Sequence, residues 1–142
     1  MKPREPFTWF VDRSLGRRIV ADLRAAGFQV EEHAAHFSDD APDTEWLGEA
    51  GRRGWVVLTK DKAVRRNVLE LAAIRTGGVA CFSLGHGNLK AEHMAQAFIA
   101  ARRKMEKALR RFDPAMTASV TVTGHVSVLM AAGQLLAPPK EV

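Results

Sequence analysis

The sequence predicts an α/β fold, a single three-layer domain in which a mostly parallel sheet is flanked by helices. Short apolar runs alternate along the chain with segments in which apolar residues recur every three or four positions. The first pattern is typical of buried strands and the second of amphipathic helices. Their alternation at short spacing favours a parallel sheet covered by helices. A chain of 142 residues suits one domain, because two would each lie near the minimum size for an independent core.

The predicted strands are rich in β-branched and aromatic residues and end at polar or glycine-containing segments. They are residues 7–11, 28–30, 55–58, 79–84 and 118–122, with the last at an edge of the sheet. Residues 126–136 fit either a strand or a helix. The stretch after Pro114 either completes the sheet or forms a contact between two copies in a homodimer. We expect the core to span residues 7–125 and residues 137–142, which include two prolines, to be a flexible tail.

The predicted helices lie between these strands and show an apolar stripe. They follow residues 15–23, 43–50, 64–75 and 89–112. Gly27 comes where a left-handed residue closes the first helix, and Asp43 is a suitable residue to begin the second. The carboxyl ends of the parallel strands, where the chain enters these helices, are the usual place for reactive groups in such folds.

The balance of charge favours a nucleic-acid partner. Lysine and arginine total 21 against 16 aspartates and glutamates, which gives a net charge of +5 and an isoelectric point near 9.9. Basic side chains bind nucleic acid by releasing the counterions of its phosphates. An acidic protein partner is the alternative explanation of the same charge.

Several classes of protein are excluded or disfavoured by the sequence. The single cysteine, Cys81, rules out an internal disulfide framework and a cysteine-rich zinc site, and His33 and His36 alone do not make one. The sequence has no P-loop, glycine-rich dinucleotide motif or serine nucleophile elbow. No apolar run approaches the roughly 18 residues of a membrane helix, and the charged start does not resemble a secretory signal. We therefore expect a soluble cytoplasmic protein.

Carboxylates follow two of the predicted strands. Asp12 ends the first apolar run, and Asp61 comes shortly after the run at residues 55–58. Parallel strands would bring both to one edge of the sheet, and Asp43 would join them if its helix begins at that edge. Carboxylates so close together need a compensating cation, and Mg²⁺ or Mn²⁺ prefers oxygen ligands. Such an ion orients and activates water for attack on a phosphodiester.

Two other interpretations of these aspartates remain open. Each of them also precedes or begins a predicted helix, where a carboxylate caps backbone N–H groups and contributes about 1 kcal/mol. A phospho-accepting signalling domain also places aspartates at strand ends, but it needs paired acids after the first strand, whereas Asp12 is followed by Arg13. Glu45 and Glu70, on the helices after Asp43 and Asp61, are candidates for an additional acid.

Basic residues surround these acids and also occupy the longest predicted helix. They suit contacts to a phosphate backbone, although a solvated helix surface explains them equally well. Near the acids we single out Arg13, Lys60, Lys62, Arg65 and Arg66, together with the polar Asn67; on the long helix, opposite its apolar stripe, we single out Arg103, Lys107 and Arg110.

The order of three motifs resembles that of the PIN-like nuclease domains. They are Phe-Val-Asp-Arg-Ser-Leu-Gly at residues 10–16, Ala-Pro-Asp-Thr-Glu-Trp-Leu at 41–47 and Trp-Val-Val-Leu-Thr-Lys-Asp-Lys at 55–62. The chain is most similar to the compact branch that is related to the Mut7-C domain and to some VapC-type toxins. The resemblance covers roughly residues 7–110.

The resemblance implies a metal-dependent endoribonuclease that holds Mg²⁺ or Mn²⁺ on Asp12, Asp43 and Asp61. Many relatives carry a further aspartate two residues after the last of these, where this chain has Ala63, so Glu45 or Glu70 would have to contribute. The resemblance also implies the toxin of a type II toxin–antitoxin pair, whose small antitoxin covers the acidic site. A catalytically weak module of the same fold that binds RNA or a protein partner is the alternative.

Overall fold

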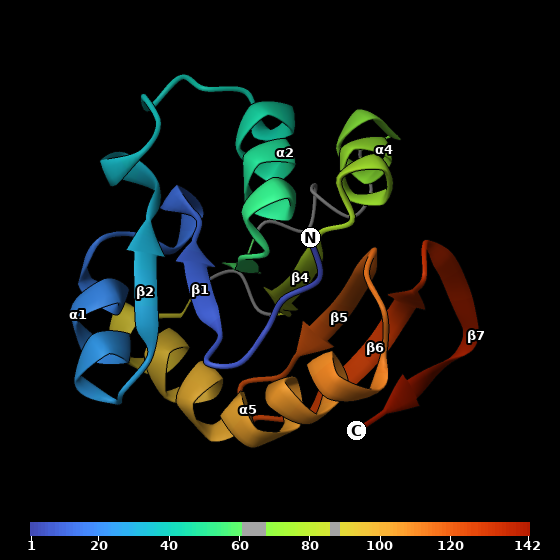
Figure 1. Cartoon of the computed structure of the whole chain (residues 1–142). Helices are drawn as coiled ribbons and strands as arrows, with labels where there is room; N and C mark the ends of the chain where they lie inside the picture. The colour runs from blue at the N-terminus through green and yellow to red at the C-terminus, as the bar shows by residue number, and fades with distance from the viewer. Residues whose placement is uncertain (61–67, 86–88) are drawn as a thin grey trace.

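The computed structural model describes residues 1–60, 68–85 and 89–142. Within them the chain forms one seven-stranded sheet in the order β2-β1-β3-β4-β5-β6-β7 (Figure 1). The strands are β1 (Thr8–Val11), β2 (Gln29–Glu32), β3 (Val56–Thr59), β4 (Ala80–Leu84), β5 (Met116–Val120), β6 (Val126–Ala131) and β7 (Gln134–Glu141). The helices are α1 (Arg18–Ala25), α2 (Asp43–Arg53), α4 (Val68–Gly77) and α5 (Ala91–Arg111), and the 3₁₀ turns are η1 (Arg13–Leu15) and η2 (His33–Ala35).

The sheet is mixed, with a parallel part and an antiparallel extension. Strands β1 to β5 pair in parallel, whereas β6 and β7 continue the sheet in antiparallel pairs. Figure 1 shows α2 and α4 side by side on one face of the sheet, and α1 and α5 pack together on the other. The predicted α/β fold with helices on both faces is confirmed.

Alternating strand residues divide the core into two layers. Trp9 of β1 points into the layer beneath α1 and α5, together with Leu58 and Phe82. Phe10, its neighbour in the sequence, points into the layer beneath α2 and α4 and stacks on Trp46 and Trp55 with ring centroids 5.5 Å from each. This period of two is the normal pleat of a strand that is buried on both faces.

The C-terminal region differs from the prediction. Residues 134–141 form strand β7, so most of the expected flexible tail is paired with β6. The core also extends past residue 125, because Val128 and Met130 are fully buried. The two prolines are compatible with a strand because β7 lies at the edge of the sheet, where a missing N–H costs no ladder hydrogen bond. The preceding strand, β5, is internal rather than at an edge.

The start of one helix agrees with the prediction and that of another differs from it. Helix α2 begins at Asp43, as predicted, and its N-cap is Pro42, so Asp43 does not cap the helix. Helix α5 begins at Ala91 after the N-cap Lys90, two residues later than expected. A proline just before the first turn fixes an extended backbone there. The side chain of Asp43 is therefore available for contacts other than capping.

Helices α2 and α4 approach each other closely at a pair of glycines. A Cβ built on Gly51 of α2 would lie 2.2 Å from the carbonyl oxygen of Gly77 at the end of α4. The same helix carries Gly48, where a Cβ would meet nothing within 4 Å. Only the first of these two positions therefore requires glycine for packing, and it allows α2 to approach the end of α4 closely.

The two glycines of α2 provide a matched test of this packing. We expect Gly51→Ala to lower the free energy of unfolding by about 1–3 kcal/mol, because the added methyl overlaps backbone that cannot move aside cheaply. We expect Gly48→Ala to leave stability unchanged or to raise it by up to about 1 kcal/mol through helix propensity. Urea denaturation of both variants measures the difference, and equal stabilities would contradict the close approach.

Candidate active site

The candidate site lies at the carboxyl ends of β1 and β3. Asp12 directly follows β1, and its backbone N–H donates to the carbonyl oxygen of Leu58 in β3 at 3.1 Å. This bond continues the parallel ladder in which Val11 pairs with Leu58. It places Thr59, the last residue of β3, beside the Asp12 side chain. The arrangement follows from two apolar strands that end at the same level of one sheet.

Asp12 is a buried carboxylate with two hydroxyl donors. Its side chain is only 4% exposed, and its Oδ2 accepts hydrogen bonds from Ser14 Oγ at 2.8 Å and Thr59 Oγ1 at 2.9 Å. Burial raises the pKa of Asp12 above its usual value, and the hydrogen bonds from Ser14 and Thr59 oppose that shift only in part. The folded chain thus holds a carboxylate where its charge is poorly solvated.

Asp43 lies near enough to act on this group. Its negative charge further raises the pKa of Asp12. Its own position is fixed, because Asp43 is the first residue of α2 and its Oδ1 accepts a hydrogen bond from Trp46 Nε1 at 2.8 Å. Its Oδ2 has no hydrogen-bond partner in the part of the chain that the structure describes. Asp12 and Asp43 thus interact electrostatically, and their joint role as metal ligands stays a prediction.

The structure gives less information about the remaining candidate acids. Asp61 lies outside the described residues. Glu45 is exposed in the first turn of α2, and Glu70 is half-buried in the first turn of α4. Among residues 1–60, 68–85 and 89–142, no group of three or more His, Cys, Asp or Glu side chains is placed to hold a metal ion. The described part of the site thus contains two of the three aspartates that the sequence singles out.

A pocket of about 210 Å³ opens beside Asp12 on the α1 side of the sheet. Its wall includes several residues that sequence reasoning did not select. They are Arg17 from the start of α1, Glu32 and His33 from the end of β2, and Asp39 from the following loop. Glu32 is the last residue of β2, whereas Asp12 directly follows β1. In the sequence Glu31 and Glu32 follow the predicted strand at residues 28–30, so acids after an apolar strand were the available signal.

His33 anchors this wall within an aromatic cluster. Its side chain is 2% exposed and packs against Phe37, Phe10 and Trp46, with ring centroids 5.5, 6.1 and 6.3 Å away. Neither ring nitrogen has a hydrogen-bond partner among the described residues. Its carbonyl oxygen accepts the backbone N–H groups of His36 and Phe37 and so closes η2. The end of β2 is therefore held firmly next to the pocket.

Some of the predicted RNA-binding residues lie at this edge of the sheet. Arg13 is exposed and lines the pocket, and Lys60 is half-buried directly after β3. Both lie next to the candidate site in the sequence and in the fold. The other predicted contacts of this group, Lys62, Arg65, Arg66 and Asn67, lie outside the described residues.

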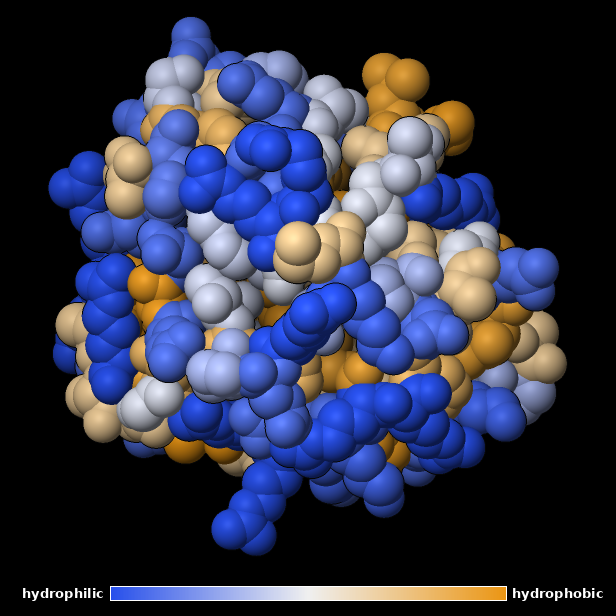
Figure 2. Space-filling view, viewed as in Figure 1, coloured by the Kyte–Doolittle hydropathy of each residue, from blue (hydrophilic) through white to orange (hydrophobic). Residues whose placement is uncertain are grey.

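The basic residues of α5 form a surface of their own. Arg103, Lys107 and Arg110 are all exposed, as predicted. Arg110 forms an ion pair with Glu5, which precedes β1, so this end of α5 lies at the opposite edge of the sheet from Asp12. In Figure 2 hydrophilic side chains cross the lower part of the molecule, where Figure 1 places α5. An RNA contacted by both surfaces would have to extend along the α1 and α5 side of the molecule.

Comparison of the sequence with known proteins identifies the family of the chain. Residues 8–86 match the family model of the PIN-like domain. The chain therefore belongs to the PIN-like domain family. A curated relative from Mycobacterium tuberculosis, named "Putative ribonuclease VapC45", is 31% identical over 106 residues, which cover 71% of this chain and 77% of the relative. No solved structure matches the chain significantly.

The burial of Asp12 predicts a stability that depends on pH. A raised pKa in the folded state means that the unfolded chain loses this proton first, near the ordinary value of 3.8. The folded state therefore loses stability as the pH rises through the interval between the two pKa values. We expect Asp12→Asn to unfold at a higher urea concentration than the wild type at neutral pH in EDTA, with the advantage vanishing below pH 3.8.

Asp22→Asn on α1 is the control for this experiment. Asp22 has no hydrogen bond or ion pair through its side chain in the part of the chain that the structure describes. Its replacement should leave the dependence on pH unchanged. An Asp12→Asn variant that is less stable than the wild type at neutral pH without metal would contradict the unfavourable burial of this charge.

Proposed function

We propose that this protein is an endoribonuclease that hydrolyses RNA phosphodiester bonds with Mg²⁺ or Mn²⁺. One observation carries the proposal. Asp12 is a buried, hydrogen-bonded carboxylate whose charge is disfavoured both by burial and by neighbouring Asp43. Because the ionised form of such a group does not stabilise the fold, a role in a reactive site explains it better than a structural role. Membership of the PIN-like family and the name of the relative support the same reaction.

The chemistry of the described carboxylates fits a hard divalent cation. Asp12 and Asp43 supply oxygen ligands, and Asp43 Oδ2 has no competing hydrogen bond among the described residues. Asp61 would be the third ligand, and Glu45 or Glu70 an additional acid in place of the residue that Ala63 replaces. When bound, such an ion lowers the pKa of a water molecule and neutralises charge on a phosphoryl oxygen.

Other residues of the chain would orient the carboxylates and guide the RNA to them. Ser14 and Thr59 fix one oxygen of Asp12 and so determine the direction of the other. Trp46 does the same for Asp43. Arg13 and Lys60 place positive charge beside the acids, where a phosphodiester would approach, and Lys62, Arg65, Arg66 and Asn67 would extend that contact. The α5 residues Arg103, Lys107 and Arg110 would hold a more distant part of the RNA.

We further propose that the protein is the toxin of a type II toxin–antitoxin pair and acts in the cytoplasm. The VapC-type name of the relative supports this role. The described helices include none that is long and apolar enough to cross a membrane. A small antitoxin that covers the acidic edge would inhibit the enzyme by blocking both RNA and metal.

Cleavage of labelled structured RNAs tests the proposed activity. We expect discrete cleavage with Mg²⁺ or Mn²⁺ and none with EDTA. We expect Asp12→Asn, Asp43→Asn and Asp61→Asn each to lower the rate at least about a hundredfold, since an electrostatic or ligand contact made in the transition state is removed. The matched control is Asp113→Asn, because Asp113 is an exposed aspartate that pairs with Lys2 away from the site.

Two results would contradict the proposal. Full activity in the three aspartate variants would remove them from the site. RNA binding without metal-dependent cleavage in the wild type would favour the alternative of a catalytically weak RNA-binding or partner-binding module, for which Ala63 is the sequence argument. A purified protein that still carries its antitoxin would also fail to cleave, so its mass must first be checked.

A further inference from the structure

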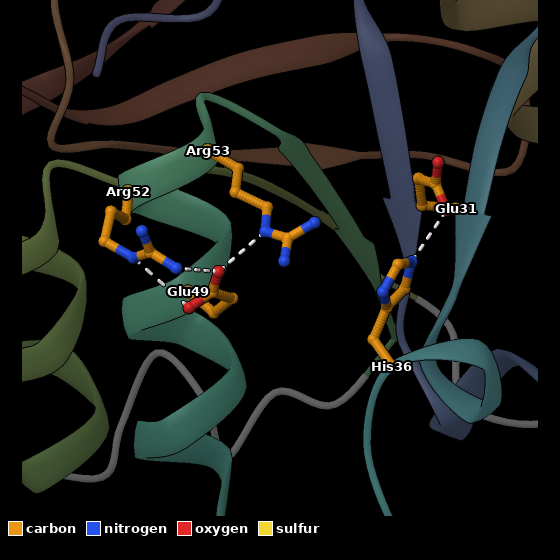
Figure 3. Close-up of polar contacts among 5 residues, drawn as sticks. All are labelled: Glu31, His36, Glu49, Arg52 and Arg53. Carbon is orange, nitrogen blue, oxygen red and sulfur yellow. Dashed lines mark hydrogen bonds and ion pairs between the residues drawn. The ribbon is translucent and has the colours of Figure 1, made fainter.

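Several charged side chains line the wall of the pocket beside Asp12. Glu32 is half-buried there, and Arg13, Arg17 and Asp39 are exposed around it. None of these four side chains forms a hydrogen bond or close ion pair within the part of the chain that the structure describes. Glu49 of α2, by contrast, forms ion pairs with Arg52 and Arg53 (Figure 3). Charges left unpaired around a concavity are suited to a ligand.

The contrast is sharpest between two neighbours on β2. Glu31 points to the α2 side of the sheet, where His36 Nε2 and Glu31 Oε2 lie 2.7 Å apart (Figure 3). Glu32, the next residue, points to the other side with Val30 and lines the pocket. The two carboxylates thus share a strand and differ in surroundings, and only Glu32 is available to a bound group.

We propose that this pocket binds the guanine base of the nucleotide next to the scissile phosphate, with Glu32 reading its Watson–Crick edge. The proposal rests on the proposed ribonuclease activity. Guanine presents two adjacent N–H donors on that edge, N1 and N2, which match the two oxygens of one carboxylate. Adenine, cytosine and uracil each present a single donor group there. Sequence-specific RNA recognition commonly reads the edges of unstacked bases in this way.

The other walls suit the rest of a nucleotide. Val11 and Val20 are buried apolar residues at the base of the pocket, against which a flat ring can lie. Arg13 and Arg17 stand at its rim, where they can contact a phosphate or stack on the base. A volume of about 210 Å³ is more than ten times the roughly 15 Å³ that a cavity needs to hold one water molecule. The wall thus combines acids for the N–H donors of a base with two arginines for a phosphate.

The pocket adjoins the acidic site at which the proposed reaction would take place. Asp12 belongs both to its wall and to the acidic site, and Asp43 lies on the opposite side of the sheet, at the start of α2. A phosphodiester at the acids would therefore have one neighbouring nucleotide on the α1 side, beside Glu32. Because η2 and the aromatic cluster around His33 hold the end of β2, the position of Glu32 is fixed before a base binds.

Binding of mononucleotides in EDTA tests the pocket without catalysis. We expect 5′-GMP to bind the wild-type protein about tenfold or more tightly than 5′-AMP, as followed by NMR chemical shifts. We expect Glu32→Gln to abolish this preference, because an amide offers only one acceptor oxygen. Glu31→Gln is the matched control on the same strand and should retain it. Both variants should keep a wild-type NMR spectrum away from the substituted residue.

Cleavage of paired RNAs that differ by one guanine-to-adenine change provides the second arm. We expect the wild type to prefer the guanine substrate about tenfold and Glu32→Gln to cut both at similar rates. Metal-dependent cleavage with equal GMP and AMP binding would overturn the pocket and leave the nuclease intact. A GMP preference through Glu32 without any cleavage would overturn the nuclease. Binding of N-acetylarginine methyl ester in preference to GMP would overturn the guanine assignment.

Discussion

The burial of the Asp12 carboxylate is the constraint on which the rest of the site depends. Parallel pairing of β1 with β3 ends both strands at one level, so Asp12 emerges beside Thr59. Two hydroxyl hydrogen bonds compensate only part of the lost hydration, and the pKa stays raised. An aspartate in these surroundings is a liability for folding. Its presence is understandable if a cation completes the site.

The surrounding packing holds the acids in place. The buried rings of Phe10 and Trp46 join β1 to α2, and the same Trp46 donates to Asp43. The glycine contact between Gly51 and Gly77 seats α2 against α4. A substitution far from the acids can therefore change their separation, because α2 connects the close packing at Gly51 to Asp43 at its first turn. Stability and site geometry are coupled through one helix.

The sequence was sufficient for the α/β class and for the central strands β1, β3 and β4. Those strands are apolar on both faces, and the residues after them are polar, so both patterns are strong. The roles of Asp12 and Asp43 as ligands stay predictions. The sequence failed for β7, because prolines and an exposed residue such as Leu135 do not alternate as in a half-buried strand. Glu32 was missed because Gln29 and Glu31 interrupt the apolar pattern of β2. That strand lies at the edge of the sheet, where polar side chains are tolerated.

The most direct test of the account is the effect of Mn²⁺ on the stability of the metal-free protein. An ion that binds only the folded state raises the free energy of unfolding in proportion to the logarithm of its concentration above Kd. We predict that Mn²⁺ raises the urea midpoint of the wild type and has little effect on Asp12→Asn. An equal rise in both proteins, or none in either, would contradict a cation site built on Asp12.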